Sequence, residues 1–172
     1  MTSTAQEADV EKLWHLHSGR IYTYVCRWAG PEAAEELVAD TFLVAWRRRT
    51  EIPANDLPWL LGVARVLCRQ HLRVEAARRD TSPLGEWPTI PDPSPGTDTS
   101  RDLLSALRGL RAADREVIFL STWEDLSVVD GAAVLGCSVT AYKVRLHRAR
   151  QRLRGQLEHP STHPSTTRKK PV

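Results

Sequence analysis

Six basic residues crowd one segment near the C-terminal end of the chain, and that segment contains no carboxylate. The segment is TAYKVRLHRARQRLRG, residues 140–155, and its cations are Lys143, Arg145, Arg148, Arg150, Arg152 and Arg154. Lysine and arginine bind the phosphates of a polyanion, and arginine also binds base edges in a DNA groove. A solvated helix face normally mixes charges of both signs. The run therefore favours a DNA-binding surface over an ordinary exposed helix.

The same segment has a second side that is apolar. At 100° per residue an α-helix places every third or fourth residue on one face, and here that face holds Tyr142, Leu146, Ala149, Leu153 and Leu157. All six cations lie off this face and are expected to point outward. Cations near the C-terminal end also gain from the helix dipole, but the dipole does not account for Lys143 and Arg145 near the start.

The residues that precede the basic helix have the signals of a helix-turn-helix. Ser127 and Asp130 form the pattern of an N-terminal cap, although Asp is shorter than the usual Glu or Gln of a capping box. Gly136 is placed to end this short helix in the left-handed conformation, and Ser138 can cap the next helix. A short helix, a tight turn with glycine and a longer basic helix form the pattern that places its second helix in a major groove.

The N-terminal segment is also predicted to be helical, with no alternation typical of strands. Apolar residues recur at intervals of three and four over residues 10–28, with a gap near Ser18, which predicts one long helix or two stacked ones. Gly30 and Pro31 predict a stop and a restart. The next helix is expected to carry acids in its first half and arginines at its end, which suits the helix dipole.

A third helix is expected after the breaker TEIPANDLP, and it carries both an apolar and a basic row. Its buried residues are expected to be Leu60, Val63, Ala64, Leu67, Cys68 and Leu72. Arg65, Arg69 and Arg73 stand four residues apart, where adjacent pairs repel by about 0.2–0.5 kcal/mol. A bound anion would relieve this repulsion. Alternatively, the arginines only shield apolar surface with their stems, and this helix alone leaves both interpretations open.

Composition divides the chain into two units. Residues 81–100 hold five prolines among Gly, Ser and Thr, so this segment is expected to be an extended linker between residues 1–80 and residues 101–158. Residues 159–172 are poor in apolar side chains and are expected to be a disordered tail. The expected fold class is all-α, with two small helical domains joined by a proline-rich linker and a helix-turn-helix in the second.

Enzymes and metalloproteins fit the sequence badly. His15 and His17 diverge around a helix, and no Ser, Cys or carboxylate is placed beside a plausible base. Cys26, Cys68 and Cys137 are far apart without metal-ligand or disulfide spacing. We expect no catalytic residue, no metal site and no cofactor.

No signal for a membrane or for export is present. No apolar run approaches the roughly 20 residues that span a bilayer, and the polar start MTSTAQEADVEK lacks the apolar core of a signal peptide. We therefore expect no membrane partner and a cytoplasmic location.

Three stretches together resemble a known family. They are AEELVADTFLVAWRR, then PWLLGVARVLCRQHLR at residues 58–73, and finally LRAADREVIFL followed by LSVVDGAAVLGCSVTAYKVRLHRARQRLR. In this order and with a proline-rich link, they resemble the extracytoplasmic-function (ECF) sigma factors of bacterial RNA polymerase over residues 10–157. The resemblance implies an alternative sigma factor, which is not an enzyme, that binds core RNA polymerase and promoter DNA. It also implies an anti-sigma factor as a third partner.

The resemblance assigns roles to individual residues of this chain. Polymerase binding is implied for Glu36, Asp40 and Leu43. Contact with the minus-ten promoter element is implied for the third helix, at Arg65, Val66, Arg69, Gln70 and Arg73. In the recognition helix for the minus-thirty-five element, the base-reading positions are Lys143, Val144, His147 and Arg148, while Ser138 and Arg145 would hold phosphate or structure.

Several residues depart from the family pattern. Val66 stands where an Asn is usual and Gln70 where an Asp is common, so a polar side chain near the melted strand is missing. In the recognition helix, Val144 replaces a common Ser, and residues 140–142 replace Gly-Thr-Val. Gly131 lies inside a helix, where glycine costs roughly 1 kcal/mol relative to alanine. The promoter sequence therefore cannot be copied from relatives.

One alternative function remains on sequence grounds. The chain could be a helix-turn-helix regulator that binds duplex DNA without polymerase and dimerises through its N-terminal helices. Tight, salt-sensitive operator binding by the free protein would favour this alternative.

Overall fold

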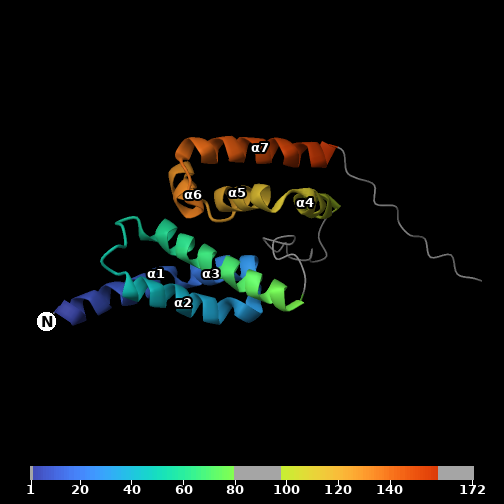
Figure 1. Ribbon diagram of the computed structural model, residues 1–172. Helices are drawn as coiled ribbons and strands as arrows, with labels where there is room; N and C mark the ends of the chain where they lie inside the picture. The colour runs from blue at the N-terminus through green and yellow to red at the C-terminus, as the bar shows by residue number, and fades with distance from the viewer. Residues whose placement is uncertain (1, 80–97, 159–172) are drawn as a thin grey trace, which may run out of the picture.

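The computed structural model describes residues 2–79 and 98–158, and their regular structure is helical (Figure 1). The elements in chain order are α1 (Thr2–Ala29), a short 3-10 helix η1 (Pro31–Ala33), α2 (Ala34–Arg47), α3 (Asp56–Arg79), α4 (Asp98–Gly109), α5 (Ala112–Thr122), α6 (Val128–Leu135) and α7 (Val139–Glu158). The predicted all-α class is confirmed. We call α1–α3 the first unit and α4–α7 the second unit.

The first unit is a bundle of three helices that pack against one another. Of the two possibilities for the N-terminal segment, the structure has one continuous helix, α1. Gly30 ends it with a φ of 88°, which only glycine adopts easily, and Pro31 starts the next element. In α2 the acids Glu35 and Glu36 lie in the first turn and Arg47 in the last, as the dipole favours.

The apolar stripes predicted for the first unit form its core, with one clear exception. Trp14 belongs to the apolar residues expected on the inner face of α1 but is 42% exposed, although its ring meets the edge of Phe42 at 4.8 Å between centroids. In α3, Leu60, Ala64 and Cys68 are fully buried as predicted. The other three predicted α3 residues, Val63, Leu67 and Leu72, are half-buried.

The second unit is built around α5, against which α6 and α7 pack, while α4 also contacts α7. Four consecutive apolar residues of α5, from Val117 to Leu120, are all buried, so this helix is covered on every side. Most of the expected linker lies outside the described residues, but its last three positions, 98–100, form the start of α4. The expected tail, residues 159–172, also lies outside the described residues.

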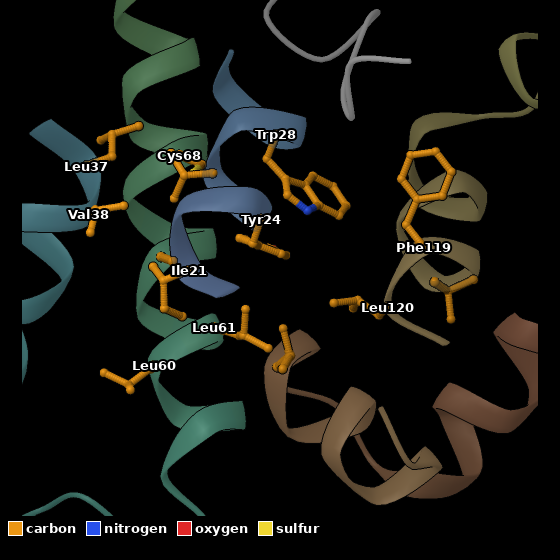
Figure 2. Close-up of a cluster of buried hydrophobic side chains, with 14 of the residues drawn as sticks. Ile21, Tyr24, Trp28, Leu37, Val38, Leu60, Leu61, Cys68, Phe119 and Leu120 are labelled. Atoms are coloured by element: carbon orange, nitrogen blue, oxygen red, sulfur yellow. The ribbon is translucent and has the colours of Figure 1, made fainter. Parts of the chain in front are cut away.

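The two units share one continuous core. Figure 2 shows Tyr24 and Trp28 of α1 and Leu61 of α3 on one side, facing Phe119 and Leu120 of α5. All five side chains are at most 2% exposed. Since burying a side chain of this size contributes about 1.5–3 kcal/mol, the contact between the units is a substantial part of the fold. In Figure 1, α7 lies on the side of the second unit that faces away from the first.

Candidate functional site

The helix-turn-helix is formed by α6 and α7, and its predicted caps are present. The backbone N–H of Asp130 donates to Ser127 Oγ at 3.1 Å, and Gly136 ends α6 in the left-handed region at φ 63° and ψ 40°. Ser138 Oγ accepts a hydrogen bond from the backbone N–H of Ala141 at 3.1 Å. Since each cap satisfies an otherwise unpaired backbone group, the turn between the two helices is well defined.

The unusual Gly131 is explained by its neighbour in α7. A Cβ atom at Gly131 would lie 2.4 Å from both Oη and Cζ of Tyr142, far inside van der Waals contact. Tyr142 is fully buried, and its hydroxyl lies 3.4 Å from the carbonyl oxygen of Val117 in α5, to which it can donate. Gly131 and Tyr142 are both departures from the family pattern, and together they make one close packing contact.

The predicted reading face of α7 is exposed. Tyr142, Leu146 and Ala149 are buried against the rest of the unit. On the opposite side, five of the six predicted residues in the second unit project into solvent, namely Lys143, Val144, Arg145, His147 and Arg148. Within residues 2–79 and 98–158, none of these side chains forms an ion pair, so the cations are available to an anion. Ser138, the sixth residue, is exposed and acts as the N-terminal cap of α7.

Two of the basic residues in the second half of α7, Arg150 and Arg152, have partners inside the second unit. Arg152 donates to both carboxylate oxygens of Asp114 at 2.8 Å, and Asp114 is buried. Arg150 donates to the hydroxyl of Ser121 at 3.1 Å. These two arginines link α7 to α5. Among the residues that the structure describes, the α7 cations without an ion pair therefore lie mainly in the first half of the helix.

The predicted polymerase-binding residues share the outer side of α2. Glu36 is exposed, Asp40 is half-buried, and Leu43 is 44% exposed. The spacing of four and three residues places them along one face of the helix, opposite the buried Phe42 and Ala45. The structure thus provides an acidic surface with an apolar residue at its end.

The predicted minus-ten residues of α3 do not share one environment. Val66 is 58% exposed, Gln70 and Arg73 are exposed, and Arg69 is half-buried. Arg65 instead lies at the contact between the units, where its side chain is only 14% exposed. The sequence left two interpretations of the arginine row open, namely a bound anion and the shielding of apolar surface. Neither included an ion pair between Arg65 and a carboxylate of the chain itself.

That carboxylate belongs to Glu116 of α5. Arg65 donates through Nε to Oε1 at 2.6 Å and through Nη2 to Oε2 at 3.2 Å, in the fork geometry that arginine and carboxylate prefer. Burial alone would lower the pKa of the Arg65 guanidinium, but the hydrogen bonds and the charge of Glu116 raise this pKa above its usual value. The Arg65 guanidinium is therefore positively charged at this contact.

A second buried carboxylate, Glu124, lies at the same contact. It forms an ion pair with Arg27 of α1, and Arg20 donates to its backbone carbonyl oxygen at 2.7 Å. Burial raises the pKa of the Glu124 carboxyl above its usual value, while Arg27 and Arg20 oppose that rise. Sequence reasoning missed both glutamates. The run of four apolar residues in α5, Val117–Leu120, was a usable signal, since four consecutive residues point to all sides of a helix and need cover from several elements.

A groove of about 640 Å³ runs between the end of α2, the first half of α3 and α6. Its walls are mainly apolar and include Val44, Trp59, Val63, Val66 and Val129.

In the described ranges, no three His, Cys, Asp or Glu side chains are grouped as metal ligands would be. No helix in the described part of the chain is long and apolar enough to cross a bilayer.

Comparison with known proteins agrees with this geometry. A family model for sigma-70 region 4 matches residues 100–153, which contain the helix-turn-helix. The RNA polymerase sigma factor CarQ of Myxococcus xanthus is 35% identical over 167 residues, an alignment that covers 90% of this chain and 93% of CarQ. The ECF RNA polymerase sigma factor BldN of Streptomyces coelicolor is 31% identical over 156 residues, covering 84% of this chain and 59% of BldN.

A solved structure extends the similarity to both units. The sigma factor RpoE from Bartonella quintana, in complex with the anti-sigma factor NepR, superposes with a TM-score of 0.65 at 26% identity. The superposition covers 88% of this chain and 98% of RpoE. Because a relative is 35% identical across nearly its whole length and the helix-turn-helix lies in a recognised sigma region, this chain belongs to the ECF sigma factors, non-enzymatic proteins that direct RNA polymerase to promoters.

Proposed function

We propose that this sigma factor selects promoters through a division of labour between its two units. The first unit, assigned to residues 1–80, binds core RNA polymerase and the minus-ten element. The second unit, for which the sequence predicted the bounds 101–158, binds the minus-thirty-five element. The observation that carries the proposal is the exposed basic surface at the start of α7, in a correctly capped helix-turn-helix, whose cations form no ion pair within the described residues.

For the minus-thirty-five element, we assign base contacts to Lys143, Val144, His147 and Arg148. Their exposure on one side of α7 supports this assignment, since a helix in the major groove reads bases with outward side chains near its start. Arg145 is exposed beside them and is assigned a phosphate contact. Ser138 is assigned a structural role, since its hydroxyl already accepts the Ala141 N–H.

For the minus-ten element, we assign α3. Gln70 and Arg73 are exposed and Arg69 is half-buried, so these side chains offer two charges and one amide to a DNA strand. Val66 contributes an exposed apolar surface in place of a hydrogen-bonding group. Arg65 belongs to the same row but needs release from Glu116 before it can bind phosphate.

For polymerase, we assign the outer side of α2, with Glu36, Asp40 and Leu43. The test is association with purified core RNA polymerase, measured by co-elution, for the wild type and for the double variant Glu36→Gln with Asp40→Asn. The double variant is expected to lose most of its association. Glu32→Gln is the matched control, because Glu32 is exposed in η1, just before this face.

Transcription from a mapped promoter separates this proposal from its alternative. Core polymerase with the wild-type protein is expected to start transcription at promoters that core polymerase alone ignores. If the wild-type protein never associates with core polymerase but binds an operator tightly by itself, it is a regulator of another class. If association is normal in the Glu36 and Asp40 double variant, the assignment of α2 is wrong.

We also propose that an anti-sigma protein binds this chain and that both act in the cytoplasm, where polymerase and promoters are found. Support comes from RpoE of Bartonella quintana, whose solved structure is a complex with the anti-sigma factor NepR and matches both units of this chain. Purification of the tagged chain from its own cells is expected to recover a stoichiometric partner that blocks transcription in the assay above.

A further inference from the structure

One apolar side chain lies in the middle of the basic face of α7. Val144 is 44% exposed, and the residues one turn before and after it, Thr140 and Arg148, are exposed as well. Residues three and four positions apart are neighbours on a helix, and those next to Val144 include no large apolar side chain. The valine therefore has no apolar cover within its own helix.

Helical geometry places Val144 almost directly opposite the packed side of α7. At 100° per residue, Tyr142 and Leu146 each lie about 160° around the helix from Val144, and both are buried. The hydrogen bonds from Arg152 to both carboxylate oxygens of Asp114, at 2.8 Å, also hold this helix on α5. Since α7 lies on the side of the second unit that faces away from the first (Figure 1), Val144 points away from the described fold.

Positive charge lies on both sides of this valine. Lys143 and Arg145 precede and follow it by one residue, so each lies about 100° around the helix from it, on opposite sides. Both are exposed. Two cations on opposite flanks suit a helix that lies between the two phosphate backbones of a major groove. The outermost line of that helix, on which Val144 lies, then faces the base edges.

Other exposed valines have apolar surroundings that Val144 lacks. Val66 and Val129 are 58% and 63% exposed, but both line the groove between α2, α3 and α6, together with Val44 and Trp59. Val144 lies outside that groove. Packing of the described chain on itself therefore does not account for an apolar side chain at this position.

We propose that Val144 is a specificity-determining residue that selects thymine in the minus-thirty-five element through its C5 methyl group. The inference rests on the proposed function of α7 in reading that element. Among the donors and acceptors of the base edges in a major groove, the apolar group is this methyl group. A valine side chain has two methyl groups and no hydrogen-bonding atom, so contact between the two removes apolar surface from water. A cytosine in the same place lacks the methyl group, and its amino group would lose water without gaining a hydrogen bond.

The test uses the complex of core polymerase with the full chain. This complex selects duplexes from a library that is randomised over the minus-thirty-five region, and we expect thymine to be enriched at one position. Each thymine of the selected site is then replaced by uracil, which differs only in lacking the methyl group. At the position that Val144 contacts, uracil is expected to weaken binding roughly fourfold, as for the loss of one buried methyl group.

Two protein variants assign the effect to a residue. Val144→Ser removes both methyl groups and is expected to bind the thymine and uracil sites equally. Any effect of uracil on the shape of the DNA would persist in this variant, so the double-mutant cycle isolates the methyl contact. Val139→Ser is the matched control, because Val139 belongs to the same helix, is 37% exposed, and lies about 140° around the helix from Val144. This control is expected to keep the full preference for thymine, and circular dichroism checks that both variants are folded.

A C5 methyl group can also belong to 5-methylcytosine. A second library, in which 5-methylcytosine replaces every cytosine, distinguishes the two sources. Thymine is expected to be enriched at the same position in both libraries. Enrichment of 5-methylcytosine in place of thymine would overturn thymine as the base that Val144 selects.

The outcomes separate this inference from the proposed function. If the wild type binds thymine and uracil equally well at every position, the methyl contact is refuted. A preference for thymine that persists in Val144→Ser would also refute the inference, since another residue would then contact the methyl group. If the wild-type chain does not associate with core polymerase, or if the complex selects no minus-thirty-five sequence, the proposed function is wrong. That failure appears before uracil is introduced, so the two failures are distinguishable.

Discussion

Replacing Gly131 with alanine adds one methyl group where α6 meets α7. On sequence grounds alone the change should stabilise the protein, since alanine is favoured over glycine inside a helix by about 1 kcal/mol. The structure predicts the opposite sign. The new Cβ would lie 2.4 Å from Tyr142 Oη and 2.7 Å from its Cε2, and ordinary contacts between such atoms are about 3.5–4.0 Å.

The size of the effect follows from these opposing contributions. Tyr142 has no exposed surface, so its ring has to move by about 1 Å inside a packed core. Overpacking of this kind costs about 1–3 kcal/mol, and we place it in the upper half because the ring is rigid. After the gain in helix propensity is subtracted, Gly131→Ala is expected to lower the free energy of unfolding by about 1–2 kcal/mol. The melting temperature then falls by roughly 2–8 °C.

Thermal and urea unfolding, followed by circular dichroism, measure this change. Gly155→Ala is the matched control, because no atom lies within 4 Å of a Cβ at that position in α7, and it is expected to stabilise by about 0.5–1 kcal/mol. In a Tyr142→Val background the ring is gone, and Gly131→Ala is expected to become stabilising. Equal stabilisation by Gly131→Ala and Gly155→Ala in the wild-type background would refute the packing argument.

Four further predictions concern the recognition helix and the core. Arg148→Ala is expected to weaken binding to a matched minus-thirty-five duplex by about 1–3 kcal/mol, with a smaller loss on scrambled DNA; equal losses in a titration would contradict base reading. Ser138→Ala is expected to cost about 1 kcal/mol in urea unfolding through loss of the cap, whereas Ser138→Asp should retain stability. Burial raises the pKa of Cys68 to about 12, so a thiol reagent at neutral pH should modify the partly exposed Cys26 and Cys137 but not Cys68. Because the unfolded thiol ionises near its usual value of 9.0 and the folded one does not, the free energy of unfolding is expected to fall as pH rises from about 9 to 12, and to fall less in Cys68→Ala.

The helices and the turn of the second unit were predictable from sequence because their signals are local. Ser127, Gly136 and Ser138 act within three or four residues of their own positions. The apolar face of α7 follows from helical periodicity alone. The exposure of Glu36 and Arg148 follows from the same periodicity, whereas their roles in binding stay predictions.

The closure between the units was not predictable in this way. Arg65 and Glu116 are 51 residues apart in sequence, and no periodicity within either helix indicates that they meet. The repulsion between Arg65 and Arg69 was compatible with a bound anion or with exposed, shielding arginines, and it carried no information on a carboxylate from the protein itself. The prediction that Trp14 is buried was wrong for a related reason. The width of the buried face of a helix depends on which other helices cover it, and the sequence of α1 does not show this.

The arrangement around α6 bears on how this sigma factor can diverge from its relatives. Helix α6 packs against α3 on one side and α7 on the other, so a substitution there disturbs two contacts at once. The outer positions of α7, such as Lys143 and Val144, project away from the fold, and a substitution there leaves the core intact. On the proposed assignment of base contacts, a few codon changes in α7 would give a duplicated gene a new set of promoters, while both copies keep the same contact between units.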